Sequence, residues 1–199
     1  MKEVSIPKLN AKGDLYKPLM ANILCGLYNV LGKEGKAYYH LFCRLIDKSV
    51  YEYNLAQDYI LEEIKTEDRL AHIFSIINHL ENCINAISRA DKVLDVILNG
   101  MYKKDKKIKK KQEILKFIDK KNIEKLETVG LKNIRNRIEH IDEDVFENKM
   151  RGGLFLNIDK KYENICINNK CLKINDLAKI IDNFNDLVLS INKNLPKSS

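Results

Sequence analysis

The sequence predicts an all-α fold, a helical bundle with a small β-hairpin insertion at residues 153–174, before the C-terminal helix. Apolar residues recur at steps of three and four along most of the chain, which is the period of an amphipathic helix. One segment instead alternates with the period of a strand. The length of 199 residues suits one domain with a proper core, so residues 1–199 are expected to fold as a single unit.

Helices are expected to fill the first third of the chain. Pro18 suits the first turn of the first helix, and Gly32 is expected to end it. The apolar face of this helix is Leu19, Ile23, Leu27 and Val30. One or two further helices should occupy residues 34–65, and their core candidates are Tyr38, Leu41, Leu45, Tyr59 and Ile60.

A long helix is expected to begin at Thr66, which suits an N-cap and is followed by two acidic residues, Glu67 and Asp68. Its apolar residues form one narrow stripe, which consists of Leu70, Ile73, Ile77, Leu80, Ile84, Ile87, Leu94 and Ile97. Residues 112–130 then predict one or two short helices that end near Gly130. The next helix has a predicted buried face of Leu131, Ile134, Ile138, Ile141 and Val145.

Residues 153–174 predict a β-hairpin or a three-stranded meander, because their apolar residues alternate around the turn sequences DKKYEN and NNK. These apolar residues are Leu154, Leu156, Ile158, Ile165, Ile167, Leu172 and Ile174. The last helix is expected to start with Asn175 or Asp176 as its cap. One face of it carries Leu177, Ile180, Ile181, Phe184, Leu187, Val188 and Ile191.

Composition favours a cytoplasmic protein with an anionic partner. The formal net charge is +7, from 35 basic and 28 acidic residues. No apolar run approaches the roughly 20 residues of a bilayer span, and the first residues lack the apolar core of a secretory signal. No membrane partner is therefore expected. The five cysteines are odd in number and scattered, which favours reduced thiols and predicts no disulfide framework.

Much of the excess charge lies in residues 103–111, KKDKKIKKK, which hold seven lysines and one acid. Such a stretch creates a local field that attracts phosphate backbones. The RNA-binding lysines predicted from it are Lys103, Lys104, Lys106, Lys107, Lys109, Lys110 and Lys111. The alternative is a solvated loop between helices, because lysines alone do not specify a ligand.

Residues 135–140, RNRIEH, gather two arginines, an asparagine and a histidine on the helix that follows Gly130. Asn136 and His140 lie one turn apart with Arg137 beside them, whereas Arg135 and His140 diverge by about 140° around the axis. One isolated helix therefore cannot be the whole site. A plain surface pair between Arg135 and Glu139 at i,i+4 spacing is the structural alternative.

These residue types suit cleavage of RNA. Histidine can accept the proton of a ribose 2′-hydroxyl or protonate the leaving oxygen, and arginine stabilises the charge of the phosphorane-like transition state. The reaction needs a base and an acid, and one motif supplies one histidine. Two copies facing each other across a twofold axis would supply both. Such chemistry needs no metal or other cofactor, leaves a 2′,3′-cyclic phosphate, and spares DNA.

Residues 135–140 resemble the R-N-x-x-x-H form of the R-x(4–6)-H signature of the HEPN family (higher eukaryotes and prokaryotes nucleotide-binding). Its members are helical bundles that dimerise so that paired motifs line a shared cleft, and many are metal-independent ribonucleases of toxin, abortive-infection and CRISPR-linked systems. The resemblance implies an endoribonuclease acting on single-stranded RNA as a homodimer, with Arg135 and His140 catalytic and Asn136 assisting. Arg137 is expected to bind RNA. An antitoxin or a defence-system protein is the implied partner.

In family toxins paired with a nucleotidyltransferase antitoxin, a tyrosine two positions after the histidine is modified; Asp142 stands at that position here, so this regulation is not expected. Two other interpretations stay open. One is a catalytically inactive HEPN-like module that binds RNA, a nucleotide or a protein. The other is a helical adaptor whose basic stretch binds nucleic acid.

Two histidine–cysteine pairs have the spacing of metal ligands on a helix: His79 with Cys83, and His40 with Cys43. No third or fourth ligand follows either pair at a recognisable spacing, so no metal site is predicted.

Overall fold

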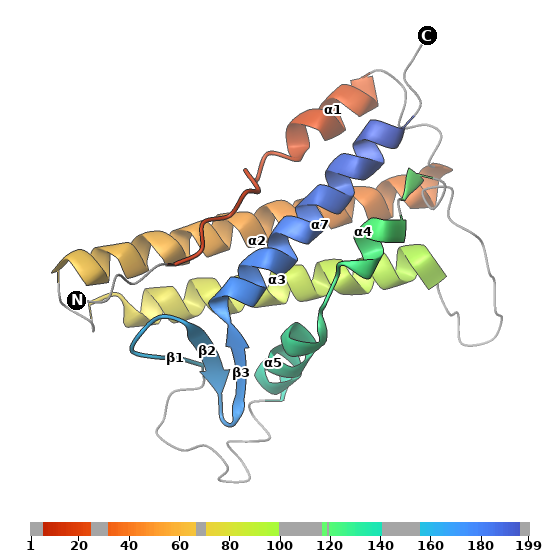
Figure 1. The fold of residues 1–199 in the computed structure, drawn as a ribbon. Helices are drawn as coiled ribbons and strands as arrows, with labels where there is room; N and C mark the ends of the chain where they lie inside the picture. Colours follow the sequence, from red (N-terminus) through yellow and green to blue (C-terminus); the bar gives the residue numbers. More distant parts are fainter. Residues whose placement is uncertain are drawn as a thin grey trace.

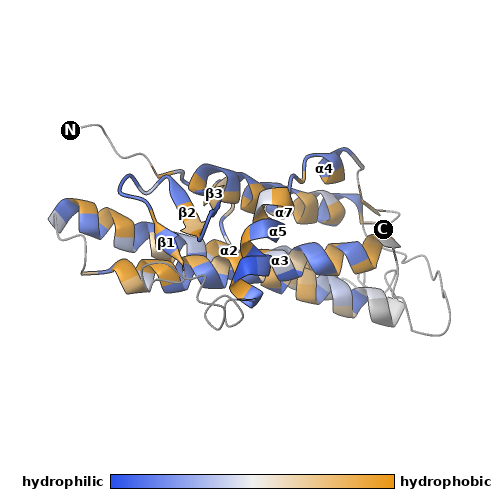
Figure 2. Cartoon of the chain, turned by 90° about the horizontal axis from the view of Figure 1, so that it is seen from below, coloured by the Kyte–Doolittle hydropathy of each residue, from blue (hydrophilic) through white to orange (hydrophobic). Residues whose placement is uncertain are grey.

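Two long antiparallel helices form the centre of the molecule. The computed structural model describes residues 6–24, 32–66, 71–99, 117–118, 120–140 and 156–195. In it, α2 (Gly32–Thr66) packs along α3 (Ile73–Asn99) (Figure 1). Apolar and polar residues alternate along both helices (Figure 2), so each turns an apolar stripe towards the other. The stripe predicted for α3 is confirmed at Leu80, Ile84, Ile87, Leu94 and Ile97, which are buried.

The buried face of α2 is rotated relative to the prediction. Leu45 and Ile60 are buried as expected, but Leu41 is exposed, and Tyr38 and Tyr59 are only partly buried. The large side chains that fill the interface are Tyr39, Phe42, Ile46, Val50 and Tyr53. With apolar residues on several sides of so long a helix, sequence alone could not identify the side that meets α3 and α7.

Helices α1 (Tyr16–Leu24) and α7 (Ile174–Asn194) pack on α2 (Figure 1). Every apolar residue predicted for the buried face of α7 is buried. The rings of Phe42 and Phe184 lie 5.8 Å apart at the α2–α7 contact. The carboxylate of Asp182 accepts hydrogen bonds from the backbone N–H groups of Asn10 and Ala11, at 3.0 and 2.9 Å, and so ties the segment before α1 to α7.

A small antiparallel sheet confirms the predicted β-structure and shows that it is the three-stranded meander rather than a single hairpin. Strands β1 (Asn157–Ile158), β2 (Asn164–Ile167) and β3 (Lys170–Lys173) are hydrogen-bonded in that order. Ile158, Ile165 and Leu172 stand opposite one another across the sheet and are buried. The β2–β3 turn places Asn168 at φ +52°, a conformation that asparagine tolerates better than most residues. The fold is therefore a helical bundle with a small sheet before its C-terminal helix.

The expectation of no disulfide is wrong for one pair of cysteines. Cys166 and Cys171 form a disulfide across the β2–β3 hairpin, where they are direct neighbours in register. The chain separation of five residues gave no signal by itself, because only the hairpin register brings the two side chains together. Cys43 and Cys83 are free and buried as expected, and Cys25 lies outside the described residues.

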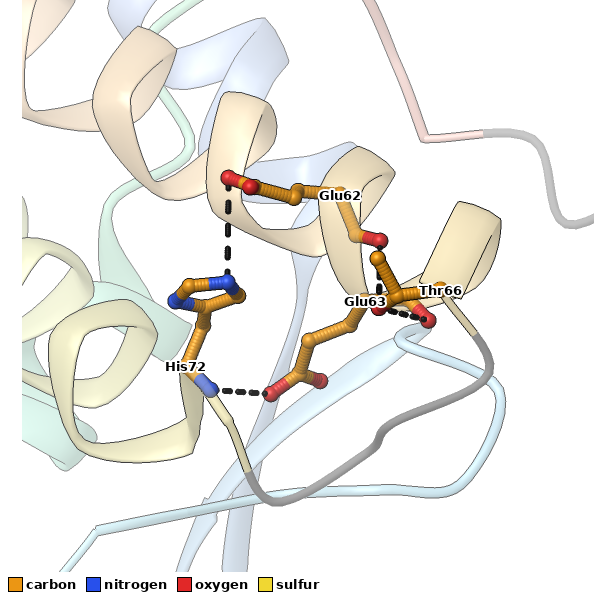
Figure 3. A network of polar contacts seen from close by, with 4 residues as sticks. All are labelled: Glu62, Glu63, Thr66 and His72. Carbon is orange, nitrogen blue, oxygen red and sulfur yellow. Dashed lines mark hydrogen bonds and ion pairs between the residues drawn. The ribbon is translucent and has the colours of Figure 1, made fainter.

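The turn between α2 and α3 corrects the role predicted for Thr66. Thr66 ends α2, and its hydroxyl donates to the carbonyl oxygen of Glu62 at 2.9 Å (Figure 3). The start of α3 is capped from a distance instead, because Oε1 of Glu63 accepts the backbone N–H of His72 at 3.0 Å (Figure 3). The other carboxylate oxygen of Glu63 accepts the Tyr162 hydroxyl at 2.7 Å, which joins this turn to the sheet.

Three other helix ends differ from the prediction. Gly32 begins α2 rather than ending a helix. Gly130 lies inside α5 (Val129–Glu139), where a Cβ atom would approach Leu172 Cδ1 to 3.2 Å, so close packing rather than termination explains this glycine. Helix α7 begins at Ile174, before Asn175 and Asp176, with no side-chain cap. Its first N–H donates to the carbonyl of Glu163, so β3 leads directly into the helix.

Between α3 and α5, the structure describes the short helix α4 (Lys120–Glu124). Several predicted features lie outside the described residues: Leu27, Val30, Glu67, Asp68, Leu70, residues 101–116, Ile141, Val145 and Leu154. Within the described ranges, no helix is both long and apolar enough to cross a membrane.

Replacing Phe184 with alanine is expected to lower the free energy of unfolding by about 3–5 kcal/mol, because it empties a fully buried site between α2 and α7. Denaturant unfolding of the full chain measures this loss. Leu189→Ala, at a residue of the same helix that is 46% exposed, is the matched control and should cost about 1 kcal/mol or less. Equal losses from the two variants would contradict this packing of α7.

Candidate functional site

The RNRIEH motif occupies the last turns of α5. Leu131 and Ile134 are fully buried and hold one face of this helix against the core. Lys132 Nζ lies 3.2 Å from Asp91 Oδ2, which ties the same helix to α3. His140 is the C-cap residue, and its backbone N–H donates to the carbonyl of Asn136 at 3.2 Å. The motif therefore stands on a fixed helix whose polar side faces outwards.

A cavity of about 350 Å³ opens over this polar side. Its walls are Asn133, Asn136, Arg137, His140 and Lys170. It thus combines a proton-transfer group, two cations and two amides that can donate and accept hydrogen bonds. Asn136, Arg137 and His140 were all predicted as site residues from the sequence, and the structure brings them together.

Lys170 is the residue that sequence reasoning missed. It lies at the start of β3, 30 positions beyond His140 in the chain. It reaches the cavity because α5 packs beside β3. The NNK turn was recognised as a hairpin tip, yet nothing in the sequence indicates that this tip lies next to the motif helix. Asn133 was also missed, although its position one turn before Arg137 places it on the same face.

Arg135 is not part of this cavity. Its side chain is only 11% exposed and forms an ion pair with Glu139, one turn later on α5. This is the i,i+4 pair that the sequence offered as the alternative to a catalytic role for Arg135. The divergence expected between Arg135 and His140 is thus present, and within one chain the two side chains do not line the same pocket. Arg137, rather than Arg135, lines the pocket together with His140.

The lysines of residues 103–111 and the position of Asp142 lie outside the described residues. The structure therefore adds nothing to the RNA-binding role predicted for Lys103, Lys104, Lys106, Lys107, Lys109, Lys110 and Lys111.

Of the two histidine–cysteine pairs, His79, Cys83 and Cys43 are engaged in the helix packing, whereas His40 is exposed. His79 Nδ1 lies 2.7 Å from Glu52 Oε2, and its ring stacks on Tyr59 with centroids 5.6 Å apart. Burial raises the pKa of both Cys43 and Cys83, which disfavours the thiolate that a metal would require. Among the described residues, no group of three or more histidine, cysteine, aspartate or glutamate side chains has the arrangement of a metal site.

Comparison with known proteins gives no relative: no family model, no curated protein and no solved structure matches this chain.

Proposed function

We propose that this protein is a metal-independent endoribonuclease of HEPN type that cleaves single-stranded RNA by attack of the 2′-hydroxyl on the adjacent phosphate. The cavity that gathers His140, Arg137 and Lys170 is the observation that carries this proposal. An imidazole beside two cations can move a proton next to a phosphodiester whose negative charge is held in place.

Each cavity residue has a role in this reaction. His140 takes the proton from the 2′-hydroxyl or gives one to the leaving 5′-oxygen. Arg137 and Lys170 bind the non-bridging phosphate oxygens, and the arginine can do so through two parallel hydrogen bonds. Asn136 and Asn133 orient the ribose or the phosphate. The products are a 2′,3′-cyclic phosphate and a 5′-hydroxyl end.

A second histidine is needed, because the base and the acid act at opposite sides of the same phosphorus atom. His140 is exposed at the end of α5, so a second copy of the chain could bring its own His140 to the same phosphate. The proposed active form is therefore a homodimer with a composite site. Its setting is the cytoplasm, as a toxin or phage-defence effector restrained by an antitoxin or another defence-system protein.

Arg135 takes a different role here from the one that the family resemblance implies. Its ion pair with Glu139 spans the turn that leads to His140. We assign it the positioning of this last turn, while Arg137 contacts the phosphate.

The Arg135–Glu139 pair also favours a second candidate function. If the family arginine is permanently engaged by Glu139, the same cavity could bind RNA or a nucleotide without cleaving it. The protein would then be a catalytically inactive HEPN-like binding module.

The first test is His140→Ala, which is expected to reduce cleavage at least a hundredfold while RNA binding persists, because it removes the proton-transfer group alone. Purified protein is incubated with single-stranded RNA in EDTA, and the ends are mapped for cyclic phosphate. His40→Ala, an exposed histidine on α2, is the control and should leave cleavage unchanged. Unmodified protein that binds RNA but never cuts it would support the binding module instead.

The two arginines can be separated by single-turnover kinetics. Arg137→Ala is expected to slow cleavage about a hundredfold, because it removes a donor to the phosphate. Arg135→Ala should slow it about tenfold or less, and Arg135→Lys, which can still pair with Glu139, should restore most of the rate. A larger loss from Arg135→Ala than from Arg137→Ala would return the phosphate-binding role to Arg135.

Mixed dimers test the requirement for two histidines. Wild-type and His140→Ala chains are mixed at varied ratios under conditions that exchange subunits, at constant total protein. If one composite site uses both histidines, the cleavage rate should fall as the square of the wild-type fraction. A linear decrease would mean that each chain acts alone.

A further inference from the structure

A second and larger cavity, of about 620 Å³, lies where the start of α5 meets β3 and the first turns of α7. It is separate from the cavity at the motif, and none of the roles proposed above uses it. Its walls are Lys125, Leu126, Glu127, Thr128, Val129, Gly130, Leu172, Asp176, Lys179, Ile180 and Asn183. We call it the α5 N-terminal cavity.

One end of this cavity has the features of a phosphate site. The first backbone N–H groups of an α-helix have no partner within the helix and carry a partial positive charge. Thr128 occupies the N-cap position of α5 and is 7% exposed, yet its hydroxyl makes no capping hydrogen bond. Because Thr128 lines the cavity, its hydroxyl can donate a hydrogen bond to a ligand there. Lys125, just after α4, and Lys179, on α7, add positive charge to the lining.

Gly130 forms part of the cavity wall in the first turn of α5, and the absence of a Cβ atom there makes room for Leu172. The loop before α5 is also held in place, because Asn183 Nδ2 donates to the carbonyl of Lys125 at 3.1 Å. The donors are thus fixed before any ligand binds, which lowers the entropic cost of binding.

The remaining wall carries two acids, Glu127 and Asp176. Asp176 lies in the first turn of α7, where the helix dipole favours a carboxylate. Two lysines and two acids leave no net side-chain charge, so the lining does not suit a bare polyanion. It does suit a nucleotide, whose phosphate meets the lysines and the helix start while its ribose hydroxyls donate to carboxylates.

The α5 N-terminal cavity and the motif cavity lie along the same face of α5. Val129 and Asn133 lie on the same face of α5 as Asn136 and His140, because each follows the previous one by three or four residues. Leu172 lines the first cavity and Lys170 the second, and the two residues point to the same side of β3. Val129 and Arg137 are about 12 Å apart along the helix axis.

We propose that the α5 N-terminal cavity binds one nucleotide through its phosphate, a few nucleotides from the bond that is cut. This inference rests on the proposed RNA-cleaving function for the identity of the ligand, a nucleotide of the same single-stranded RNA. The same phosphate chemistry would also accept a free mononucleotide, which the experiment distinguishes.

The test measures binding by the full chain carrying His140→Ala, so that cleavage does not interfere. The ligand is a short fluorescein-labelled single-stranded RNA, titrated at several salt concentrations. The double variant Lys125→Gln/Lys179→Gln is expected to weaken binding about tenfold and to lower the slope of log K against log salt by about 0.7, the value for one phosphate contact on a single strand. Thr128→Val, which keeps the side-chain shape, should weaken binding severalfold.

The matched control is Lys160→Gln/Lys193→Gln, which changes the net charge equally at exposed positions of the β1–β2 turn and of the last turn of α7. It should leave the affinity within about twofold, since its lysines touch neither cavity. Equal effects of the two double variants on affinity and slope would overturn the inference, because binding would then depend only on overall charge.

A second measurement identifies the source of the phosphate. Adenosine 5′-monophosphate and inorganic phosphate are titrated while the amide NMR signals of Val129 and Gly130 are followed. Shifts with the mononucleotide, without any effect of the lysine variant on RNA binding, would support a free-nucleotide site. Unchanged amide signals with every ligand, RNA included, would overturn the inference.

Cleavage by the unmodified protein is recorded separately. Cleavage that does not depend on Lys125 and Lys179 would support the proposed function and overturn this inference. Binding that depends on these lysines, without cleavage, would support this inference and contradict the proposed function.

Discussion

The rotation of α5 about its own axis decides which residues of the motif can act together. Leu131 and Ile134 are fully buried, and Ile138 packs against the same core, so the centre of the buried face is fixed between them. From there, His140 lies about 150° around the helix and points outwards, whereas Arg135 lies about 70° away, at the edge of the buried face. The burial of two apolar side chains therefore directs Arg135 and His140 to different sides of α5, although the HEPN-like signature would place both in one site. It also explains why the Arg135 side chain is only 11% exposed.

Periodicity was sufficient for the parts of the fold that depend on one element. The apolar stripes of α3 and α7 and the alternating apolar residues of the small sheet follow from burial of one face. They could therefore be predicted directly from the sequence. The same reasoning put Asn136, Arg137 and His140 on one face of a helix. Glycine and threonine signals failed at Gly130 and Thr66, because there a neighbouring element decides: Leu172 packs against the first, and Glu63 replaces the cap expected from the second. The place of Lys170 in the cavity depends on how the sheet packs against α5, and the Cys166–Cys171 disulfide depends on the register of two strands. Neither arrangement can be read from a single sequence.

Polar contacts at the turn between α2 and α3 help to position the small sheet, and with it one wall of the motif cavity. Glu63 is buried and receives the hydroxyl of Tyr162 from the β1–β2 turn, as well as the backbone N–H of His72. The turn itself is ordered by Asp159, which accepts hydrogen bonds from Glu163 and Asn164. Burial raises the pKa of Asp159, but these hydrogen bonds lower it more, so its net pKa lies below the ordinary value. The sheet is thus attached to the helix pair through polar contacts, and it carries Lys170 to α5.

In the proposed symmetric homodimer, the 5′-to-3′ direction of a bound RNA strand would give the two His140 side chains different roles. His140 ends α5, and the α5 N-terminal cavity lies at the other end of the same helix. In the proposed homodimer, a twofold axis that brings the two His140 side chains together would place the two α5 N-terminal cavities on opposite sides of the scissile bond. The protein is the same in both directions along this path, but RNA runs from 5′ to 3′. In the proposed reaction, one histidine would then meet the 2′-hydroxyl and the other the leaving 5′-oxygen. Identical residues would act as base and acid because the RNA strand, unlike the protein dimer, is not symmetric.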